Sequence, residues 1–172
     1  MPTSFVAVVL LIPAVYYDLV ERRIPNALIG LGLIVGLAAV FSEAGWQAIP
    51  EHLLAAFLAF SISLPFWFLG WMGAGDVKFV MVLGLPLGLG SVFVFLANTA
   101  LCGLLLALAC LALKGMLGGF FRRLGVSMNL SLGLNRLVYV EPDSGQPQAT
   151  LPYALAIAGG VVLTLSGVSP VL

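Results

Sequence analysis

The chain has 172 residues, of which 62% are apolar and only 8% charged, and its mean hydropathy is +1.17. A soluble domain carries about 25% charged residues, so this composition excludes an ordinary soluble fold and places the chain in a lipid bilayer. The formal net charge is zero, and the chain therefore lacks the basic footprint of a nucleic-acid-binding protein.

The N-terminal stretch is expected to be a retained membrane span. Residues 1–17 contain no Lys or Arg, and acidic and basic residues follow directly. A cleavable secretory signal instead begins with a positive region and ends at a small-residue cleavage site. We therefore interpret this stretch as the first span.

Apolar runs, separated by charged residues and by Pro and Gly, predict about six transmembrane helices of about 20 residues each. In chain order the expected spans are 3–20, 27–42, 52–70, 77–89, 91–113 and 151–170. The fourth run is short and contains Pro86, so it is either a half-depth helix or continuous with the fifth. The predicted fold class is an all-α polytopic bundle, with residues 1–172 as a single transmembrane domain.

Residues 114–150 are the one long polar stretch and predict a cytoplasmic loop, with a short interfacial helix around 117–124. In a six-span topology all basic residues fall on one side of the membrane: Arg22, Arg23, Lys78, Lys114, Arg122, Arg123 and Arg136. Because basic residues favour the cytoplasmic side, this distribution predicts that both termini face outward. Small residues at four-residue spacing further predict close helix packing: Gly32 with Gly36, Gly84 with Gly88, and Ala156 with Gly160.

Three of the seven acidic residues are expected at cytoplasmic helix ends, namely Asp18, Glu21 and Asp76. An ionisable group in or near a span is costly and is by default a functional hypothesis. Taken alone, Asp18 is as well explained by a simple flanking charge. Glu21 lies beside two arginines, where a solvated charge is the plain interpretation.

Asp18 and Asp76 together indicate a functional site more strongly than either residue does alone. Two membrane crossings separate them, so both carboxylates return to the same face of the membrane and can meet. Two carboxylates close together do not both ionise easily, so one of them retains a proton. Such a pair hydrolyses peptide bonds, because the ionised member takes a proton from water while the protonated member polarises the scissile carbonyl.

The surroundings of Asp76 are specific, since it lies in the run Gly-Ala-Gly-Asp-Val-Lys over residues 73–78. Glycines before an Asp at a helix start permit unusual backbone geometry and close approach of a substrate strand. The N-terminus of a helix also favours an ionised carboxylate. The alternative interpretation is a glycine turn in which Asp76 is only the N-cap residue.

Other catalytic designs fit the sequence poorly. The single histidine, His52, is expected on the outer side, and no two-histidine zinc motif or Gly-x-Ser-x-Gly sequence is present. Cys102 and Cys110 are eight residues apart in one apolar run, about 12 Å on a helix, which is too far for a disulfide. We therefore expect no metal and no cofactor.

Three motifs resemble those of the type IV prepilin peptidases, a family of Gly-x-Gly-Asp intramembrane aspartic proteases. The first is Asp18 with Ile24-Pro25-Asn26, and the second is Gly73-Ala74-Gly75-Asp76-Val77-Lys78. The third is Leu151-Pro152-Tyr153-Ala154, where the family more usually has Pro-Tyr-Gly. The motifs follow the family order and span nearly the whole chain.

The resemblance implies that Asp18 and Asp76 are the catalytic pair. It implies that the motif residues around them support the site or bind substrate: Gly73, Gly75, Lys78, Pro25, Asn26, Pro152 and Tyr153. It also implies a multi-pass enzyme of the bacterial inner membrane that cleaves pilin and pseudopilin precursors after a glycine at the cytoplasmic face. Membrane lipid and the pilus assembly machinery are the other implied partners, and no nucleic acid is expected.

Larger members of that family also methylate the new N-terminus and carry an extra domain with a four-cysteine zinc site. This sequence has no Cys-x-x-Cys and resembles the short branch that serves Flp, or tight-adherence, pili. Two alternatives remain open at this point. One is a non-enzymatic membrane component of a pilus or secretion assembly, and the other is a small transporter that carries ions on paired aspartates.

Overall fold

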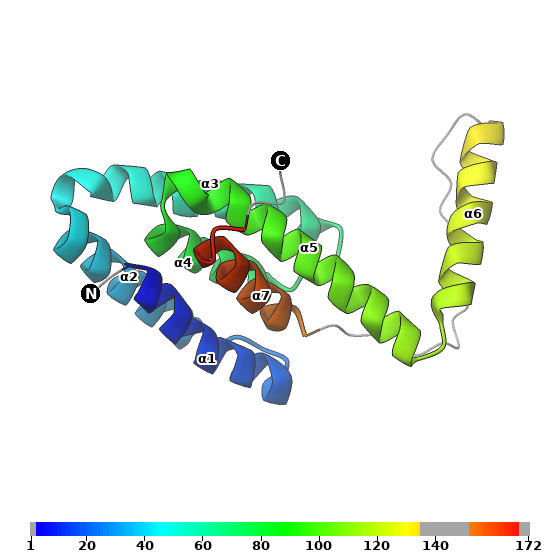
Figure 1. Ribbon diagram of the computed structural model, residues 1–172, viewed down its shortest axis with the longest axis horizontal. Coiled ribbons are helices and arrows are strands. Elements are labelled where there is room, and N and C mark those ends of the chain that lie inside the picture. Colours follow the sequence, from blue (N-terminus) through cyan, green and yellow to red (C-terminus); the bar gives the residue numbers. More distant parts are fainter. Residues whose placement is uncertain (1–2, 135–151, 169–172) are drawn as a thin grey trace. The chain divides into compact units, whose positions relative to one another are not determined.

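The computed structural model describes residues 3–134 and 152–168, and within them the chain is helical (Figure 1). The helices are α1 (Thr3–Glu21), α2 (Asn26–Ala44), the 3₁₀ turn η1 (Trp46–Ala48), α3 (Ile49–Phe68), α4 (Ala74–Leu87), α5 (Leu89–Leu113), α6 (Leu117–Leu134) and α7 (Tyr153–Leu165). The chain divides into two compact units, residues 1–103 with 152–172, and residues 104–151. The all-α class predicted from the sequence is confirmed for the described residues.

Four helical stretches are long and apolar enough to cross a membrane: α1, α2, η1 with α3, and α5. The other two helices of the first unit are shorter, since α4 has 14 residues and α7 has 13. At 1.5 Å per residue α4 is about 21 Å long, less than the roughly 30 Å of a bilayer core. The expected fourth span is thus a separate short helix that ends before α5, and the count of six spans stays a prediction.

The short helix α4 is the centre of the first unit. It packs against α1, α2, α3 and α7 (Figure 1), and almost every residue from its second turn onward is buried. Its fully buried side chains include Phe79, Val82, Leu83 and Leu85. A helix that is apolar on all sides needs neighbours on all sides, and the surrounding helices supply them while exposing their own apolar side chains outward.

Glycines on α2 allow α4 to approach closely. A Cβ atom added at Gly32 would lie 2.6 Å from Val82 Cγ1, and one at Gly36 would lie 2.8 Å from Leu85 Cδ2. Contacts this short do not occur between real side chains, so a larger residue at either position would require Val82 or Leu85 to shift. The small-residue packing predicted from the spacing of Gly32 and Gly36 is confirmed.

The C-terminal end of α4 is held by His52. The His52 Nδ1 atom donates a hydrogen bond to the Leu85 carbonyl oxygen over 2.7 Å, and that carbonyl is among the last four of the helix, which have no intrahelical partner. The helix then ends at Gly88, whose φ of +73° lies in the left-handed region that favours glycine. His52 therefore has a structural role at the end of α4 opposite to Asp76.

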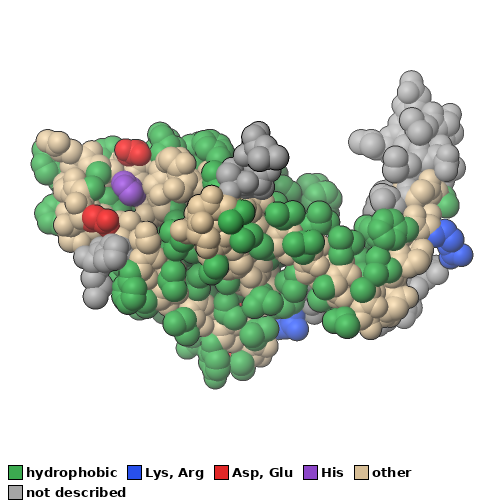
Figure 2. All heavy atoms as spheres, in the orientation of Figure 1, with side chains coloured by type: hydrophobic (Ala, Val, Ile, Leu, Met, Phe, Trp, Pro, Cys, Tyr) green, Lys and Arg blue, Asp and Glu red, His purple; other side chains and the backbone are tan. Residues whose placement is uncertain are grey.

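The two ends of the first unit carry different groups. At one end the Thr3 backbone N–H donates to Glu43 Oε2 over 2.6 Å, and Figure 2 shows the visible acidic and histidine side chains gathered near the α2–α3 connection. The C-terminal end of α1 and the N-terminal ends of α2, α4 and α7 meet at the other end (Figure 1). Asp18 and Asp76 both lie at this second end.

In the second unit, α6 is longer than predicted. The sequence predicted a short helix around 117–124, whereas α6 covers Leu117–Leu134 and follows a turn in which Gly115 has a φ of +66°. Its apolar residues recur at helical spacing over the whole length, which explains the longer helix. The remainder of the expected cytoplasmic loop, with Arg136, Glu141 and Asp143, lies outside the described residues.

Gly84 is expected to be essential for the contact between α3 and α4. A Cβ atom there would lie 2.9 Å from Ala59 Cβ, 3.2 Å from the Ala55 carbonyl oxygen and 3.3 Å from Ala56 Cα, and two of these three atoms are backbone atoms that no side-chain rotation can move. Gly84→Leu should lower the free energy of unfolding by at least about 1–3 kcal/mol, the usual effect of overpacking, which thermal unfolding in detergent would measure.

The matched control is Gly30→Leu, because Gly30 also lies in a helix but a Cβ atom there meets nothing within 4 Å. This variant should unfold at or above the wild-type temperature, since Leu forms helices better than Gly. Equal stability of the two variants would show that the α3–α4 contact does not limit stability.

Candidate active site

Asp76 lies in the first turn of α4, outside the four long helices. Gly73 is the N-cap residue of α4, so Asp76 is the third residue of the helix and not its cap. Its carboxylate folds back and accepts a hydrogen bond from the Gly73 backbone, which is one half of a capping box. A Cβ atom at residue 73 would lie 2.9 Å from Asp76 Oδ2, so Gly73 leaves room for this carboxylate.

Gly75, the second glycine of the motif, contacts a different segment. A Cβ atom at Gly75 would lie 3.4 Å from Ile24 Cβ and 3.5 Å from the Ile24 backbone nitrogen. Ile24 belongs to the turn between α1 and α2, where Arg22 has a φ of +53° and Pro25 is the N-cap residue of α2. The first and second sequence motifs therefore lie against each other at this glycine.

A polar contact also joins these two motifs. Lys78 Nζ donates a hydrogen bond to Asn26 Oδ1 over 3.2 Å, and both side chains are exposed. Asn26 begins α2 and Lys78 lies in the first turns of α4, so the pair ties the starts of these two helices together. The structure thus brings together the Pro25–Asn26 and Gly73–Lys78 segments that the sequence analysis selected.

Asp18 lies in the last turns of α1 and is buried, with 7% of its surface exposed. Its Oδ2 atom accepts a hydrogen bond from the Ala154 backbone N–H over 3.0 Å. Ala154 is the second residue of α7, after the N-cap residue Pro152, and such N–H groups have no partner inside their own helix. The start of α7 therefore gives the Asp18 carboxylate a fixed hydrogen-bond donor.

The sequence analysis selected Pro152 and Tyr153 but missed Ala154. The reason is that Ala154 contributes its backbone N–H, which every residue except proline carries. The only sequence signal for Ala154 was its position two residues after Pro152, because the first N–H groups of a helix have no hydrogen-bond partner within that helix. The change from the more usual glycine to alanine at this position leaves that donor in place.

Tyr153 connects α7 with the other aspartate. Its side chain is partly buried and lies within electrostatic range of Asp76. Its hydroxyl would lie 3.8 Å from a Cβ atom at Gly103 of α5. Tyr153 therefore lies between α5 and the Asp76 side of the site.

The two aspartates lie close enough for their charges to interact. Burial, and then the negative charge of Asp18, raise the pKa of Asp76 from its ordinary value of 3.8 to about 6, against the opposing effect of the Gly73 hydrogen bond. Asp76 therefore keeps its proton to a higher pH than an ordinary aspartate does. A carboxyl that titrates near neutral pH beside a second carboxylate is suited to acid–base chemistry.

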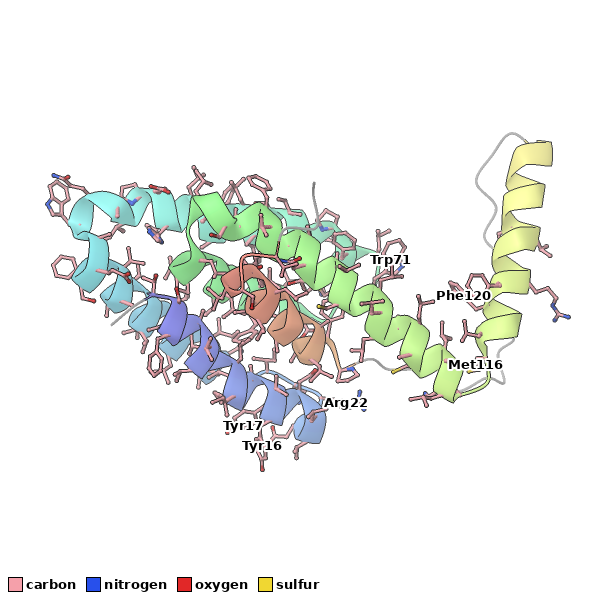
Figure 3. The ribbon with its side chains drawn as sticks, viewed as in Figure 1. Tyr16, Tyr17, Arg22, Trp71, Met116 and Phe120 are labelled. Carbon is pink, nitrogen blue, oxygen red and sulfur yellow. The ribbon has the colours of Figure 1, made fainter. Side chains whose placement is uncertain are left out.

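Several other residues lie near Asp18 at the C-terminal end of α1. Figure 3 shows Tyr16, Tyr17 and Arg22 at the C-terminal end of α1, and the two tyrosine rings pack edge to face with centroids 5.8 Å apart. Glu21 is exposed, in contrast to the buried Asp18. The geometry therefore brings Asp18, and not Glu21, to the start of α7.

The other end of α7 is held by α5. The Asn98 side-chain amide donates hydrogen bonds to Thr164 Oγ1 over 3.1 Å and to the Val168 carbonyl over 2.9 Å. Gly160 packs directly on Thr99, with no room for a side chain at residue 160. The sequence analysis gave residues 91–113 only as an expected span and did not select Asn98, which positions the helix that carries Ala154.

Among the residues that the structure describes, no three His, Cys, Asp or Glu side chains form a group that could hold a metal ion. The side chains that converge at this end of the first unit are two carboxylates, a phenol, an amide and an ammonium group. Their chemistry suits proton transfer to and from a bound substrate and a water molecule.

Asp76→Asn is expected to stabilise the protein at neutral pH. The pKa of Asp76 is raised in the folded state, so the wild type loses stability as the pH rises from about 4 through about 6. The variant has no such ionisation, and its free energy of unfolding should exceed that of the wild type by roughly 1–3 kcal/mol near pH 7. Thermal unfolding in detergent at about pH 4 and pH 7 measures the difference, which should shrink at the lower pH.

The exposed neighbour of the other aspartate provides the control for this measurement. Glu21→Gln should unfold like the wild type at both pH values, because Glu21 is solvated. If Asp76→Asn showed no gain at neutral pH, then burial and the charge of Asp18 do not act on Asp76 as the geometry indicates.

A sequence model of the type IV leader peptidase family matches residues 5–108. The match covers more than half of the chain and contains both Asp18 and Asp76. No curated protein and no solved structure matches the chain. The chain belongs to the type IV leader peptidase family, a family of aspartic peptidases.

Proposed function

We propose that this protein is a prepilin leader peptidase in which Asp18 and Asp76 together activate a water molecule. The observation that carries the proposal is the electrostatic pairing of these two carboxylates at one end of the first unit. Membership of the type IV leader peptidase family supports pilin-like precursors as the substrates. The proposed substrate class includes pseudopilins and the Flp pilins that the motif resemblance implies.

The hydrolysis begins with Asp76 protonated and Asp18 ionised. Asp18 takes a proton from water as the water oxygen attacks the scissile carbonyl carbon, and Asp76 donates its proton to the carbonyl oxygen. The C–N bond then breaks, and the proton on Asp18 passes to the leaving amine. Asp76 regains a proton from the hydroxyl groups of the intermediate as the new carboxyl group forms.

The position of the pair limits which peptide bond is cleaved. Both aspartates lie at the ends of helices, so the bond is at the boundary between the membrane and water. Arg22 and Arg23 follow the C-terminal end of α1 and Lys78 lies near the N-terminal end of α4, so all three belong to the same end of the first unit as the aspartates. Basic residues favour the cytoplasmic side. The proposed site therefore faces the cytoplasm from the inner membrane, where the leader of a precursor joins its apolar segment.

A glycine before the scissile bond fits this geometry. Glycine lets the substrate backbone approach the two carboxylates, and it resists helix formation at the bond to be cut. A bulky residue in place of the substrate glycine would separate the scissile carbonyl from Asp76.

Asp18→Asn and Asp76→Asn should each reduce precursor cleavage by at least a hundredfold, because the first removes the base and the second removes the acid of the proposed mechanism. The double variant should be no worse than either single variant, since the two residues act as a unit. Purified enzyme is mixed with a pilin precursor, and mass spectrometry of the product N-termini gives both the rate and the bond cleaved.

Glu21→Gln is the control, because Glu21 lies on the same helix end but is exposed, and it should retain most of the activity. Substantial turnover by either Asn variant, at wild-type protein level, would contradict the two-aspartate mechanism. Cleavage after a residue other than glycine would contradict the proposed specificity while leaving the mechanism intact.

Ala154→Pro tests the backbone donor to Asp18. The substitution removes the N–H that Asp18 accepts, and the loss of a hydrogen bond to a charged group should lower the rate by about ten- to a hundredfold. Ala154→Gly preserves the N–H and should retain activity.

Leu155→Pro is the matched control, since it places proline one residue further along the same turn. The Leu155 N–H bonds to the Pro152 carbonyl and not to Asp18. Equal losses in Ala154→Pro and Leu155→Pro would assign the effect to distortion of α7, and the contact with Asp18 would then have no catalytic part.

A further inference from the structure

Helix α6 begins directly after α5, a helix of membrane-spanning length. At 25 residues α5 is about 37 Å long, more than the roughly 30 Å of a bilayer core, so its end reaches a membrane surface. A Schellman turn ends the helix there, in which the Met116 N–H donates to the Leu111 carbonyl over 2.9 Å. The Gly115 N–H donates to the Ala112 carbonyl over 3.0 Å, and Gly115 has a φ of +66°. Because α6 starts at Leu117, its first turn lies at the same membrane surface.

The large apolar residues of α6 follow one side of the helix. The helix has 18 residues but is not among those apolar enough to cross a membrane. At about 100° per residue, the Leu, Phe and Met residues between 117 and 128 fall within an arc of about 100°, at positions 117, 120, 121, 124 and 128. Arg122 and Arg123 occupy positions on either side of this arc, each about 120–140° from its centre. An apolar side with flanking basic residues is typical of a helix that lies in a membrane interface.

The apolar side of α6 presents two phenylalanine rings. Phe120 and Phe121 are 39% and 55% exposed, and their rings pack edge to face with centroids 5.6 Å apart. Figure 3 shows Phe120 beside the first turn of α6, and Figure 2 shows the basic atoms of this helix on the side away from the apolar side chains near its start. The two rings therefore form an exposed apolar surface that suits insertion between lipid chains.

The charged residues of this part of the chain are all basic. Between Asp76 and Glu141 the sequence contains no acidic residue, whereas the end of α5 and the start of α6 carry Lys114, Arg122 and Arg123. An Arg guanidinium binds a phosphate group through two parallel hydrogen bonds. Each Lys or Arg near an anionic membrane surface strengthens the attraction about fivefold. Anionic headgroups at the surface where α5 ends therefore match the charge of α6.

We propose that α6 lies on the membrane surface at the end of α5 and binds the headgroups of anionic lipids through Arg122 and Arg123, with Phe120 and Phe121 among the acyl chains. The sequence analysis expected a shorter interfacial helix and assigned no ligand to it. None of these residues belongs to the candidate active site, so the proposal does not depend on the proposed function. An acidic protein would match the same charge, but two exposed rings on a helix that starts at the end of a span favour lipid.

Hydrogen–deuterium exchange of the full chain in lipid nanodiscs tests the proposal. One set of discs contains phosphatidylcholine alone, and a second set contains equal parts of phosphatidylcholine and phosphatidylglycerol. The amides of α6 should exchange at least about fivefold more slowly in the anionic discs, the effect of one basic residue at an anionic surface. Peptides from the buried helix α4 should exchange alike in both sets. Raising the salt to about 1 M, where the Debye length is only about 3 Å, should remove most of the difference.

Three variants separate the charged contribution from the apolar one. The double variant Arg122→Gln with Arg123→Gln should exchange its α6 amides at the same rate in both sets of discs. Phe121→Gln should speed exchange in both sets, because the apolar contact does not depend on lipid charge. Val126→Gln is the matched control, since Val126 is also exposed but lies about 180° from Leu117. This control should exchange like the wild type.

Each outcome supports or overturns the proposal, and the salt experiment needs only the wild type. Equal exchange of wild-type α6 in both sets of discs at low salt would show that anionic headgroups are not its ligand. A lipid difference that persists in the double arginine variant would assign the binding to other residues. If Phe121→Gln and Val126→Gln speed exchange equally, then loss of helix explains the effect and the proposed orientation is wrong. Protection in neutral discs that grows with the number of protein copies per disc would show that another copy, and not lipid, covers α6.

Discussion

The packing of α4 is the constraint on which the rest of the molecule depends. A helix of 14 residues does not cross a bilayer by itself. Both of its ends must therefore be enclosed by the helices that pack around it. Gly32, Gly36 and Gly84 let α2 and α3 approach closely enough to enclose it, and His52 bonds to its last turn. The N-terminus of α4 is thereby fixed at the bundle end, and Asp76 with it.

Placing two carboxylates at this position costs stability, and the backbone offsets part of the cost. Each aspartate receives one N–H group, from Gly73 for Asp76 and from Ala154 for Asp18. Neither donor is a cation, and the pKa of Asp76 rises to about 6 through burial and the charge of Asp18. An arginine in place of either donor would favour the ionised carboxylate and so oppose the proton donation by Asp76 that we propose.

The parts of the fold that were predictable are those that depend on local composition. Apolar runs locate the helices, and the two-crossing argument places Asp18 and Asp76 on the same side because it needs only their order in the chain. The sequence did not determine the length of α4, since a run containing Pro86 is consistent both with a half-depth helix and with a helix continuous with the next one. Ala154 and Asn98 were not predictable, because a backbone donor has no side-chain signature and a lone buried amide resembles its apolar neighbours in a hydropathy pattern.

The candidate site includes a segment that lies outside the family match. The matched residues end at 108, whereas the donor to Asp18 comes from residue 154. Within the first unit α7 is held against α5 by Asn98 at its far end and by the direct packing of Gly160 on Thr99. Burying the donors of an amide in a span costs free energy unless they are hydrogen-bonded, so Asn98 favours the position of α7 in which its Nδ2 group donates to Thr164 and Val168. That position also brings Ala154 to Asp18, which makes the α5–α7 contact the means by which the C-terminal helix becomes part of the site.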